Sequence, residues 1–285
     1  MINKIKVAVV GAGTMGNGIA HVFALSEISE EVILVDLNAE ILELAEGNII
    51  KSLTRQLSKN FISKNEMTNA IKKIKYSTTI NSAYQCNLFI EAVKEDLDVK
   101  INVFEAIDKI CNSDTILATN TSSISISKIS ASLEHKKNVI GMHFMNPVPI
   151  MKLVEIIKGE YTSNSILKRV LEYVSSINKI PIECNDSPGF ISNRILMPMI
   201  NEASYALMEG VATPEAIDGI MKLGMSHPMG PLKLADLIGI DVCVSIMNVL
   251  KEGFNNKKYT VCPLLVEMVE KNKLGIKTKE GFYKY

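Results

Sequence analysis

The stretch that decides the fold is Lys4-Ile-Lys-Val-Ala-Val-Val-Gly-Ala-Gly-Thr-Met-Gly-Asn-Gly-Ile-Ala20. It begins with an apolar run typical of a strand, passes through Gly-x-Gly-x-x-Gly, and continues with the pattern of a helix. A second apolar run, 31–35, ends in the acid Asp36, which follows Gly16 by 20 residues. This combination of strand, glycine loop, helix and acid is typical of a domain that binds a dinucleotide, either nicotinamide or flavin.

Each part of this motif has a physical role in holding a dinucleotide. Gly11 permits a tight turn, Gly13 lets the backbone approach the pyrophosphate, and Gly16 lets the helix pack against the strand. The helix that starts there offers free N–H groups and partial positive charge to the phosphates. Asp36 is then placed to accept hydrogen bonds from the adenosine ribose hydroxyls.

The composition excludes several other classes of protein. Lys plus Arg equals Asp plus Glu, at 31 each, so no net charge attracts nucleic acid or an anionic membrane. The five cysteines are scattered without metal-ligand spacing, which indicates free thiols in a reducing compartment and no metal centre. No apolar run reaches the ~20 residues of a membrane span, and no leader precedes the first strand. We therefore expect a cytoplasmic protein.

The 285 residues divide into two parts of different character. Strands alternate with helices as far as residue 184, which predicts an α/β, Rossmann-type dinucleotide-binding domain over 1–184 with a mostly parallel sheet covered on both faces. Only helical segments follow, so 185–285 is predicted to be an all-helical C-terminal domain. The expected helices of that domain are 189–208, 214–221, 231–250 and 263–272.

Two residues of the first domain have the chemistry of proton transfer. His143 ends one predicted strand, and Glu155 lies in the next strand, 12 residues on. A short turn between neighbouring strands can set the carboxylate against the imidazole, fixing its tautomer and leaving the other ring nitrogen to move a proton. The alternative is a satisfied core histidine beside a solvated acid. The position of the pair at the carboxyl ends of strands in a dinucleotide-binding sheet favours the catalytic interpretation.

Two further polar positions fit the same chemistry. Ser122 follows a strand, where its hydroxyl can bind a substrate oxygen, although serine runs also form turns and helix caps. Asn193 begins the helical domain, where it can face the nicotinamide, although a surface helix residue is the alternative.

Across nearly its whole length, the sequence resembles the L-3-hydroxyacyl-CoA dehydrogenases, and it looks most like their shorter bacterial members, the 3-hydroxybutyryl-CoA dehydrogenases. The resemblance is carried by several motifs in order. They are Gly11-Ala-Gly-Thr-Met-Gly16, Glu91-Ala-Val-Lys-Glu95, Asn120-Thr-Ser122, His143-Phe-Met-Asn146-Pro, Asp186-Ser-Pro-Gly-Phe-Ile-Ser-Asn193, His227-Pro-Met-Gly230-Pro231 and the tail Lys277–Tyr285.

The resemblance implies an NAD-dependent enzyme with His143 as the catalytic base and Glu155 as its partner. Ser122 and Asn193 would bind the reacting end of a short-chain acyl-CoA substrate. The residues that the motif and the resemblance together assign to the cofactor are Gly11, Gly13, Thr14, Met15, Gly16, Asp36, Ala92, Glu95, Lys100, Asn120, Ser122 and Asn146.

Coenzyme A needs cations for its phosphates. Lys51 and Arg55 are spaced i, i+4, so they share one helix face on a segment where family members carry a basic patch. The alternative is that they form the solvated face of an amphipathic helix. Two other functions stay open, a dehydrogenase of a non-CoA 3-hydroxy acid such as gulonate and a non-catalytic, crystallin-like relative.

The helical domain carries more apolar residues than about 100 residues can hide alone, which predicts a homodimer. The residues in question are Ile191, Ile195, Leu196, Met197, Met199, Ile200, Leu232, Leu234, Leu237, Ile238 and Ile240.

Overall fold

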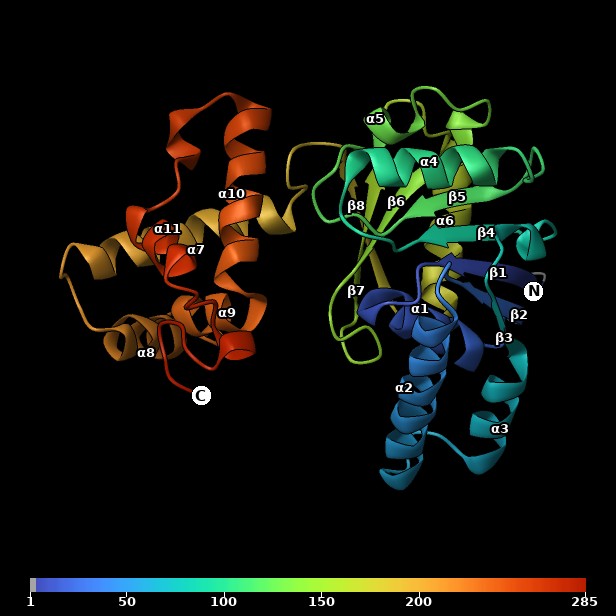
Figure 1. The fold of residues 1–285 in the computed structure, drawn as a ribbon, viewed down its shortest axis with the longest axis horizontal. Helices are drawn as coiled ribbons and strands as arrows, with labels where there is room; N and C mark the ends of the chain where they lie inside the picture. Colours follow the sequence, from blue (N-terminus) through green and yellow to red (C-terminus); the bar gives the residue numbers. More distant parts are fainter. Residues whose placement is uncertain (1–3) are drawn as a thin grey trace. The chain divides into compact units, whose positions relative to one another are not determined.

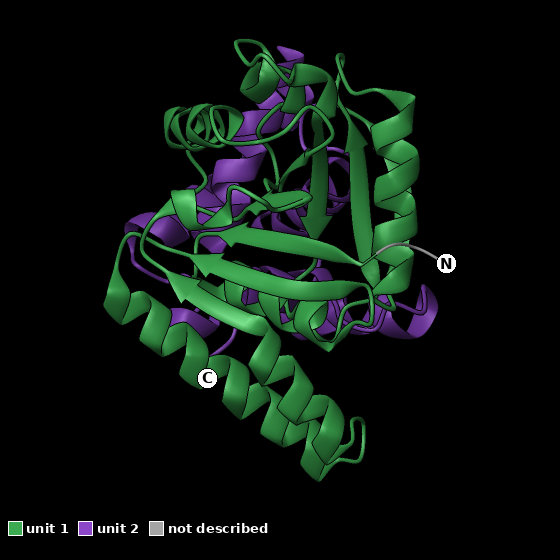
Figure 2. Ribbon diagram, turned by 90° about the vertical axis from the view of Figure 1, so that its right-hand side faces the viewer, with its two compact units in different colours: residues 1–186 green, residues 187–285 purple. Residues whose placement is uncertain are grey.

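The computed structural model describes residues 4–285, which fall into two compact units: unit 1 extends to Asp186, and unit 2 is Ser187–Tyr285 (Figures 1 and 2). Unit 1 is built on one sheet, whose strands lie in the order β3-β2-β1-β4-β5-β6-β7-β8. Its strands are β1 (Ile5–Val10), β2 (Ser29–Val35), β3 (Ile74–Ser77), β4 (Leu88–Glu91), β5 (Ile116–Thr119), β6 (Val139–Phe144), β7 (Leu153–Lys158) and β8 (Ile180–Asn185). All neighbouring strands are parallel except β6 and β7, so the predicted Rossmann-like fold is confirmed.

Helices cover both faces of this sheet, and its central strands, such as β4 and β5, are fully buried. The helices of unit 1 are α1 (Thr14–Leu25), α2 (Ala39–Ser58), α3 (Lys64–Lys73), α4 (Leu97–Asp108), α5 (Ile126–Ser130) and α6 (Asn164–Ser176). Alternate strand residues such as Val7 and Val9 share one core cluster with α1 and α6. The other face meets α4 and α5, where Ile126 packs against the backbone of Gly141. The helices α2 and α3 extend beyond the sheet as a hairpin (Figure 1).

Local sequence explains several of these element boundaries. Asn38 caps α2 by accepting a hydrogen bond from the Glu40 N–H. Ser63 and Glu66 form the predicted capping box at the start of α3. Two elements were not predicted. The edge strand β3, Ile74-Lys-Tyr-Ser, lacks the continuous apolar run that marks the equally short β4 and β5, and the single-turn helix α5 is too short to show a periodicity.

Unit 2 is helical, as predicted, with only isolated β-bridges near the end of the chain. Its helices are α7 (Ser192–Met208), α8 (Pro214–Gly224), α9 (Pro231–Ile238), α10 (Ile240–Phe254) and α11 (Pro263–Glu270). The expected single helix over 231–250 is wrong. Gly239 has φ +104°, a conformation that interrupts the helix and separates α9 from α10.

Two buried carboxylates organise the second unit. Asp218, from α8, accepts hydrogen bonds from the Leu232 and Lys233 N–H groups and so caps the start of α9. Asp236, in α9, accepts hydrogen bonds from the Phe282 and Tyr283 N–H groups and fixes the C-terminal tail. Within residues 4–285, no helix combines the length and the apolar character needed to cross a membrane.

Candidate functional site

The glycine loop between β1 and α1 has the geometry that a dinucleotide needs. Gly11 has φ +101°, which supplies the tight turn at the end of β1. A Cβ on Gly16 would lie 1.7 Å from the Gly11 carbonyl oxygen, so only glycine lets α1 approach the loop this closely. A Cβ on Gly13 would meet no protein atom within 4 Å. Gly13 is also the N-cap of α1 and offers no side-chain cap, so the first N–H groups of the helix suit a pyrophosphate.

Asp36 stands immediately after β2 and is fixed against this loop. Its Oδ2 accepts a hydrogen bond from the Ala12 N–H at 2.8 Å, and its Oδ1 accepts one from the Asn38 N–H at 3.1 Å. The carboxylate is therefore oriented by backbone on both sides. Loop, helix terminus and acid together fit an adenine dinucleotide.

His143 and Glu155 are brought together by the pairing of β6 with β7. They are directly opposite each other in the antiparallel register, so both side chains project from the same face. The Nδ1 atom of His143 lies 3.0 Å from Oε2 of Glu155. Glu155 is only 4% exposed, so the alternative of a solvated acid is wrong. A buried carboxylate at Nδ1 orients the imidazole ring, which is the arrangement expected of a histidine that exchanges a proton at its other nitrogen.

A buried ionic network lies beside the cofactor loop, at the end of β4. The Nζ atom of Lys100 is 2.7 Å from Oε1 of Glu91 and 3.2 Å from Oε2 of Glu95. Thr119 donates its hydroxyl to the other carboxylate oxygen of Glu91 at 2.7 Å. Both Lys100 and Glu91 are almost completely buried. Glu91 was not predicted from the sequence as a member of a buried network, although it begins the motif Glu91-Ala-Val-Lys-Glu95.

Glu95 holds the loop that carries Ser122. Its Oε1 accepts hydrogen bonds from the Thr121 hydroxyl at 2.6 Å and from the Ser122 N–H at 2.8 Å. The Ser122 hydroxyl and both the N–H and the hydroxyl of Ser123 also donate to it, each at 3.2 Å. Burial raises the pKa of Glu95, but the charge of Lys100 and these hydrogen bonds outweigh it and lower the pKa overall. The ionised carboxylate therefore sets the position of Ser122.

The carboxyl ends of β5 and β6 are joined beside the histidine. The amide oxygen of Asn120, which follows β5, accepts a hydrogen bond from the Phe144 N–H at 2.9 Å. Unit 1 thus places Asn120, Ser122 and His143 at the ends of two adjacent strands, as expected for a ligand site in such a sheet.

Asn146 and Ala92 lie at the same edge of the sheet. Asn146 is exposed just beyond the end of β6, and Ala92 follows β4, with its carbonyl group close to Gly11. Lys51 and Arg55 are exposed on α2, which leaves their two interpretations open. Asn193 belongs to the first turn of α7 in unit 2 and is buried, so the alternative of a surface residue is wrong.

These features define the class of protein as an NAD-dependent oxidoreductase. They are the dinucleotide-binding loop, Asp36, and the buried pair of His143 and Glu155. Residues 6–187 match the family description "3-hydroxyacyl-CoA dehydrogenase, NAD binding domain", and residues 189–285 match "3-hydroxyacyl-CoA dehydrogenase, C-terminal domain". The chain belongs to the 3-hydroxyacyl-CoA dehydrogenase family.

Individual relatives are similar over their full lengths. The "3-hydroxybutyryl-CoA dehydrogenase" of Clostridioides difficile is 47% identical over 280 residues, which are 98% of this chain and 99% of that protein. The protein of the same name from Bradyrhizobium diazoefficiens is 46% identical over 98% of this chain and 95% of its own length. The crystal structure of (S)-3-hydroxybutyryl-CoA dehydrogenase from Ralstonia eutropha has a TM-score of 0.96 and 42% identity, covering 99% of both chains.

Proposed function

We propose that the enzyme oxidises the 3-hydroxyl of a short-chain 3-hydroxyacyl-CoA, 3-hydroxybutyryl-CoA above all, and catalyses the reverse reduction. The observation that carries this proposal is the buried His143–Glu155 pair at the carboxyl edge of an NAD-binding sheet. The relatives described above, whose names specify this substrate, support the choice of a four-carbon acyl group.

The proposed mechanism divides the work between the cofactor and the protein. Held by the Gly11–Gly16 loop and Asp36, NAD would supply the acceptor for the hydride that leaves C3 of the substrate. Nε2 of His143 takes the hydroxyl proton, while the Glu155 carboxylate stabilises the resulting imidazolium through Nδ1. The hydroxyl of Ser122 binds the oxygen at the reacting carbon. An intact, buried pair of this kind argues against a non-catalytic, crystallin-like role.

We assign the cofactor to the residues around the β1–α1 loop and the adjoining strand ends. Gly11, Gly13 and Asp36 are supported by the geometry described above. The other proposed contacts are Thr14, Met15, Gly16, Ala92, Glu95, Lys100, Asn120, Ser122 and Asn146.

Asp36 should make the enzyme prefer NADH to NADPH. A 2′-phosphate would meet the negative carboxylate and would replace a ribose hydroxyl that donates to it. Losing a hydrogen bond to a charged group costs about 1.5–3 kcal/mol, so kcat/KM should be at least roughly tenfold higher with NADH. Steady-state kinetics with both cofactors checks this, and Asp36→Ser should reduce the preference. Equal values of kcat/KM for the two cofactors in the unaltered enzyme would refute it.

Lys51 and Arg55 should bind the phosphates of coenzyme A. The double variant Lys51→Gln/Arg55→Gln should raise KM for acetoacetyl-CoA about 2–30-fold, because two exposed ion pairs are lost. The value of kcat should stay near that of the unaltered enzyme, since these contacts bind ground and transition states alike. The effect should shrink as salt rises. Lys168→Gln, at an exposed lysine of α6, is the matched control. An unchanged KM would show that the two cations form only a solvated helix face.

A substrate series from four to sixteen carbons tests the proposed acyl group. The value of kcat/KM should be highest for the shortest thioesters. A steady rise beyond eight carbons would contradict the butyryl assignment and leave only the broader hydroxyacyl-CoA activity of the family.

We also propose a homodimer that forms through unit 2. Four of the residues expected to form the dimer surface, Met197, Ile200, Leu232 and Ile240, are buried in the core of the chain instead. Support for the proposal comes from the apolar side chains that are exposed, which include Ile191, Ile195, Leu237, Val211, Ile220, Leu223 and Met225. Light scattering at micromolar concentration should give twice the chain mass of 31.4 kDa. A stable species of one chain mass would refute it.

A cytoplasmic location remains part of the proposal. Support comes from Cys86, Cys111, Cys243 and Cys262, which are free thiols, as in proteins of a reducing compartment.

A further inference from the structure

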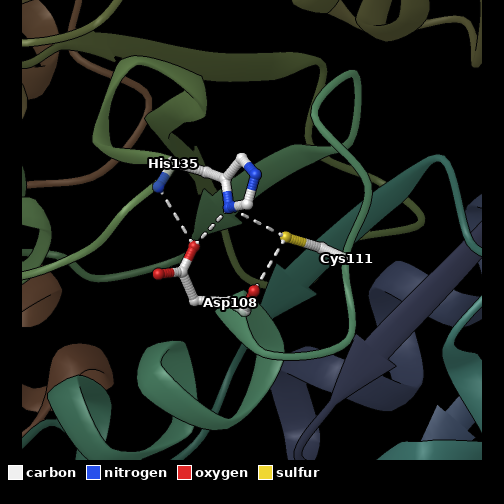
Figure 3. A group of neighbouring side chains, drawn as sticks. All are labelled: Asp108, Cys111 and His135. Carbon is white, nitrogen blue, oxygen red and sulfur yellow. Dashed lines mark hydrogen bonds and ion pairs between the residues drawn. The ribbon is translucent and has the colours of Figure 1, made fainter.

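Three potential metal ligands meet at one point of unit 1, away from the proposed active site (Figure 3). Asp108 is the last residue of α4, Cys111 follows in the next turn, and His135 precedes the short 3-10 helix Lys136–Asn138. These positions come before β5 and β6, so the cluster lies at the amino ends of these strands. Ser122 and His143 lie at the carboxyl ends, which separates the cluster from the proposed catalytic residues.

The three ligand atoms already have nearly the spacing of a tetrahedral metal site. Nδ1 of His135 lies 2.8 Å from Oδ1 of Asp108 and 3.6 Å from Sγ of Cys111. All three ligand atoms lie within 4.8 Å of one another. Bond lengths of 2.0–2.3 Å to zinc separate tetrahedral ligands by about 3.3–3.6 Å. The His135–Cys111 distance already has this value, and an increase of about half an ångström between Asp108 and His135 would bring that pair to it as well.

The direction of the ring distinguishes this cluster from a proton-relay triad. In a relay, the thiol and the carboxylate face different nitrogens of the imidazole. Here the same nitrogen, Nδ1, faces both Sγ of Cys111 and Oδ1 of Asp108, as Figure 3 shows. One proton on Nδ1 can serve only one of these two neighbours well, whereas one cation can bind all three atoms.

Backbone N–H groups hold the Asp108 carboxylate in position beside the imidazole of His135. Oδ2 of Asp108 accepts a hydrogen bond from the Glu134 N–H at 2.8 Å, and Oδ1 accepts one from the His135 N–H at 3.2 Å. Such outer contacts orient the ligands of known metal sites. The side chains of His135 and Asp108 are 21% and 12% exposed, so an ion and a water ligand can reach them.

We propose that Asp108, Cys111 and His135 bind a divalent cation of the zinc class, with water as the fourth ligand. One imidazole, one thiolate and one carboxylate favour zinc over magnesium or calcium, which prefer oxygen ligands. The thiol proton passes to the buffer as the sulfur–metal bond forms. The ion would tie the end of α4 to the segment that leads into β6, and its role would be structural.

Cobalt titration of the full-length, metal-free enzyme tests the site directly. One equivalent of Co²⁺ should produce the absorption of a tetrahedral cobalt–thiolate centre, and Zn²⁺ should displace it. Cys111→Ser should abolish the thiolate band. Loss of a residue that only orients a metal ligand typically weakens metal binding roughly 10–100-fold. His135→Asn removes a ligand itself, so it should weaken cobalt binding at least as much. Cys184→Ser, at the other partly exposed thiol, is the matched control and should keep the band.

Thermal unfolding gives a second readout that does not depend on cobalt. Free Zn²⁺ at a hundredfold excess over its Kd should raise the melting temperature of the unaltered enzyme by roughly 5–10 °C, and EDTA should reverse the change. His135→Asn should lose this response. The proposal is overturned if the unaltered enzyme gives no cobalt–thiolate band, or if the band persists in Cys111→Ser.

Discussion

Replacing His143 by glutamine should lower kcat by about 10²–10⁴-fold, because the variant has no group that can exchange the hydroxyl proton. The affinity for NADH should stay near that of the unaltered enzyme, since His143 lies outside the glycine loop and the Asp36 region. Stopped-flow measurement of hydride transfer, with NADH binding followed by fluorescence, separates the two quantities. His135→Gln is the matched control, because this histidine also pairs with a carboxylate through Nδ1 but lies at the opposite edge of the sheet. Its kcat should be unchanged.

The Glu155→Gln variant extends this test to the pair. The glutamine cannot stabilise an imidazolium as a carboxylate does, so kcat should fall here too. Because Glu155 is proposed to act through His143, the loss in the double variant should be much smaller than the product of the two single losses. Independent, multiplicative losses would contradict the 3.0 Å pairing as a functional unit.

Lys100→Met should reduce the free energy of unfolding of the NAD-free enzyme by about 3–5 kcal/mol. The substitution removes one partner of a buried ion pair and leaves the carboxylate of Glu91 without its cation in the interior. Urea unfolding without cofactor measures the change. Lys94→Met, at an exposed lysine nearby, should alter stability by no more than about 0.5 kcal/mol.

This experiment also separates two roles for Lys100. If the lysine served only as a contact for the cofactor, its loss would weaken NAD binding and leave the NAD-free stability unchanged. That outcome would contradict the structural role of the Glu91–Lys100–Glu95 network.

The same network predicts a dependence of stability on pH. Because the pKa of Glu95 is lower in the folded enzyme than its usual value of 4.5, its contribution to stability is present above that value. The contribution is lost as the pH falls through the lowered pKa. Lys100→Met removes a charge that lowers the pKa of Glu95. The free energy of unfolding of this variant should therefore decrease less as the pH falls.

The cofactor-binding half of the site could be predicted from sequence because it is local. Strand, glycine loop, helix and Asp36 follow one another within a single βαβ unit, and each has a recognisable residue pattern. The His143–Glu155 contact could be predicted as well, since a short connection between neighbouring strands leaves few registers. Gly239 shows the limit of such reasoning, because a glycine inside an apolar helical pattern is tolerated in some helices and ends others.

The Glu91–Lys100–Glu95 network was not predicted because it depends on tertiary contacts. The position of Lys100 in the sequence nevertheless indicated a buried partner. Lys100 lies on the same face of α4 as Phe104 and Ile107, both of which are fully buried. A lysine on an apolar helix face needs a buried partner, and Glu91 provides it. The cluster of Asp108, Cys111 and His135 gave no comparable signal. Its histidine is separated from the other two residues by β5 and α5, so no fixed spacing marks it.

We propose that this NAD-dependent enzyme acts on a coenzyme A thioester. The most direct test compares the rate of NADH oxidation with acetoacetyl-CoA and with free acetoacetate, and it measures the rate of NAD reduction with free sugar acids. We expect efficient turnover of the thioester. The value of kcat/KM for the free acids should be lower by at least roughly 2–30-fold, which is the effect expected from losing the Lys51 and Arg55 contacts alone. Equal kcat/KM for acetoacetyl-CoA and acetoacetate, or preferred oxidation of a sugar acid, would contradict the account.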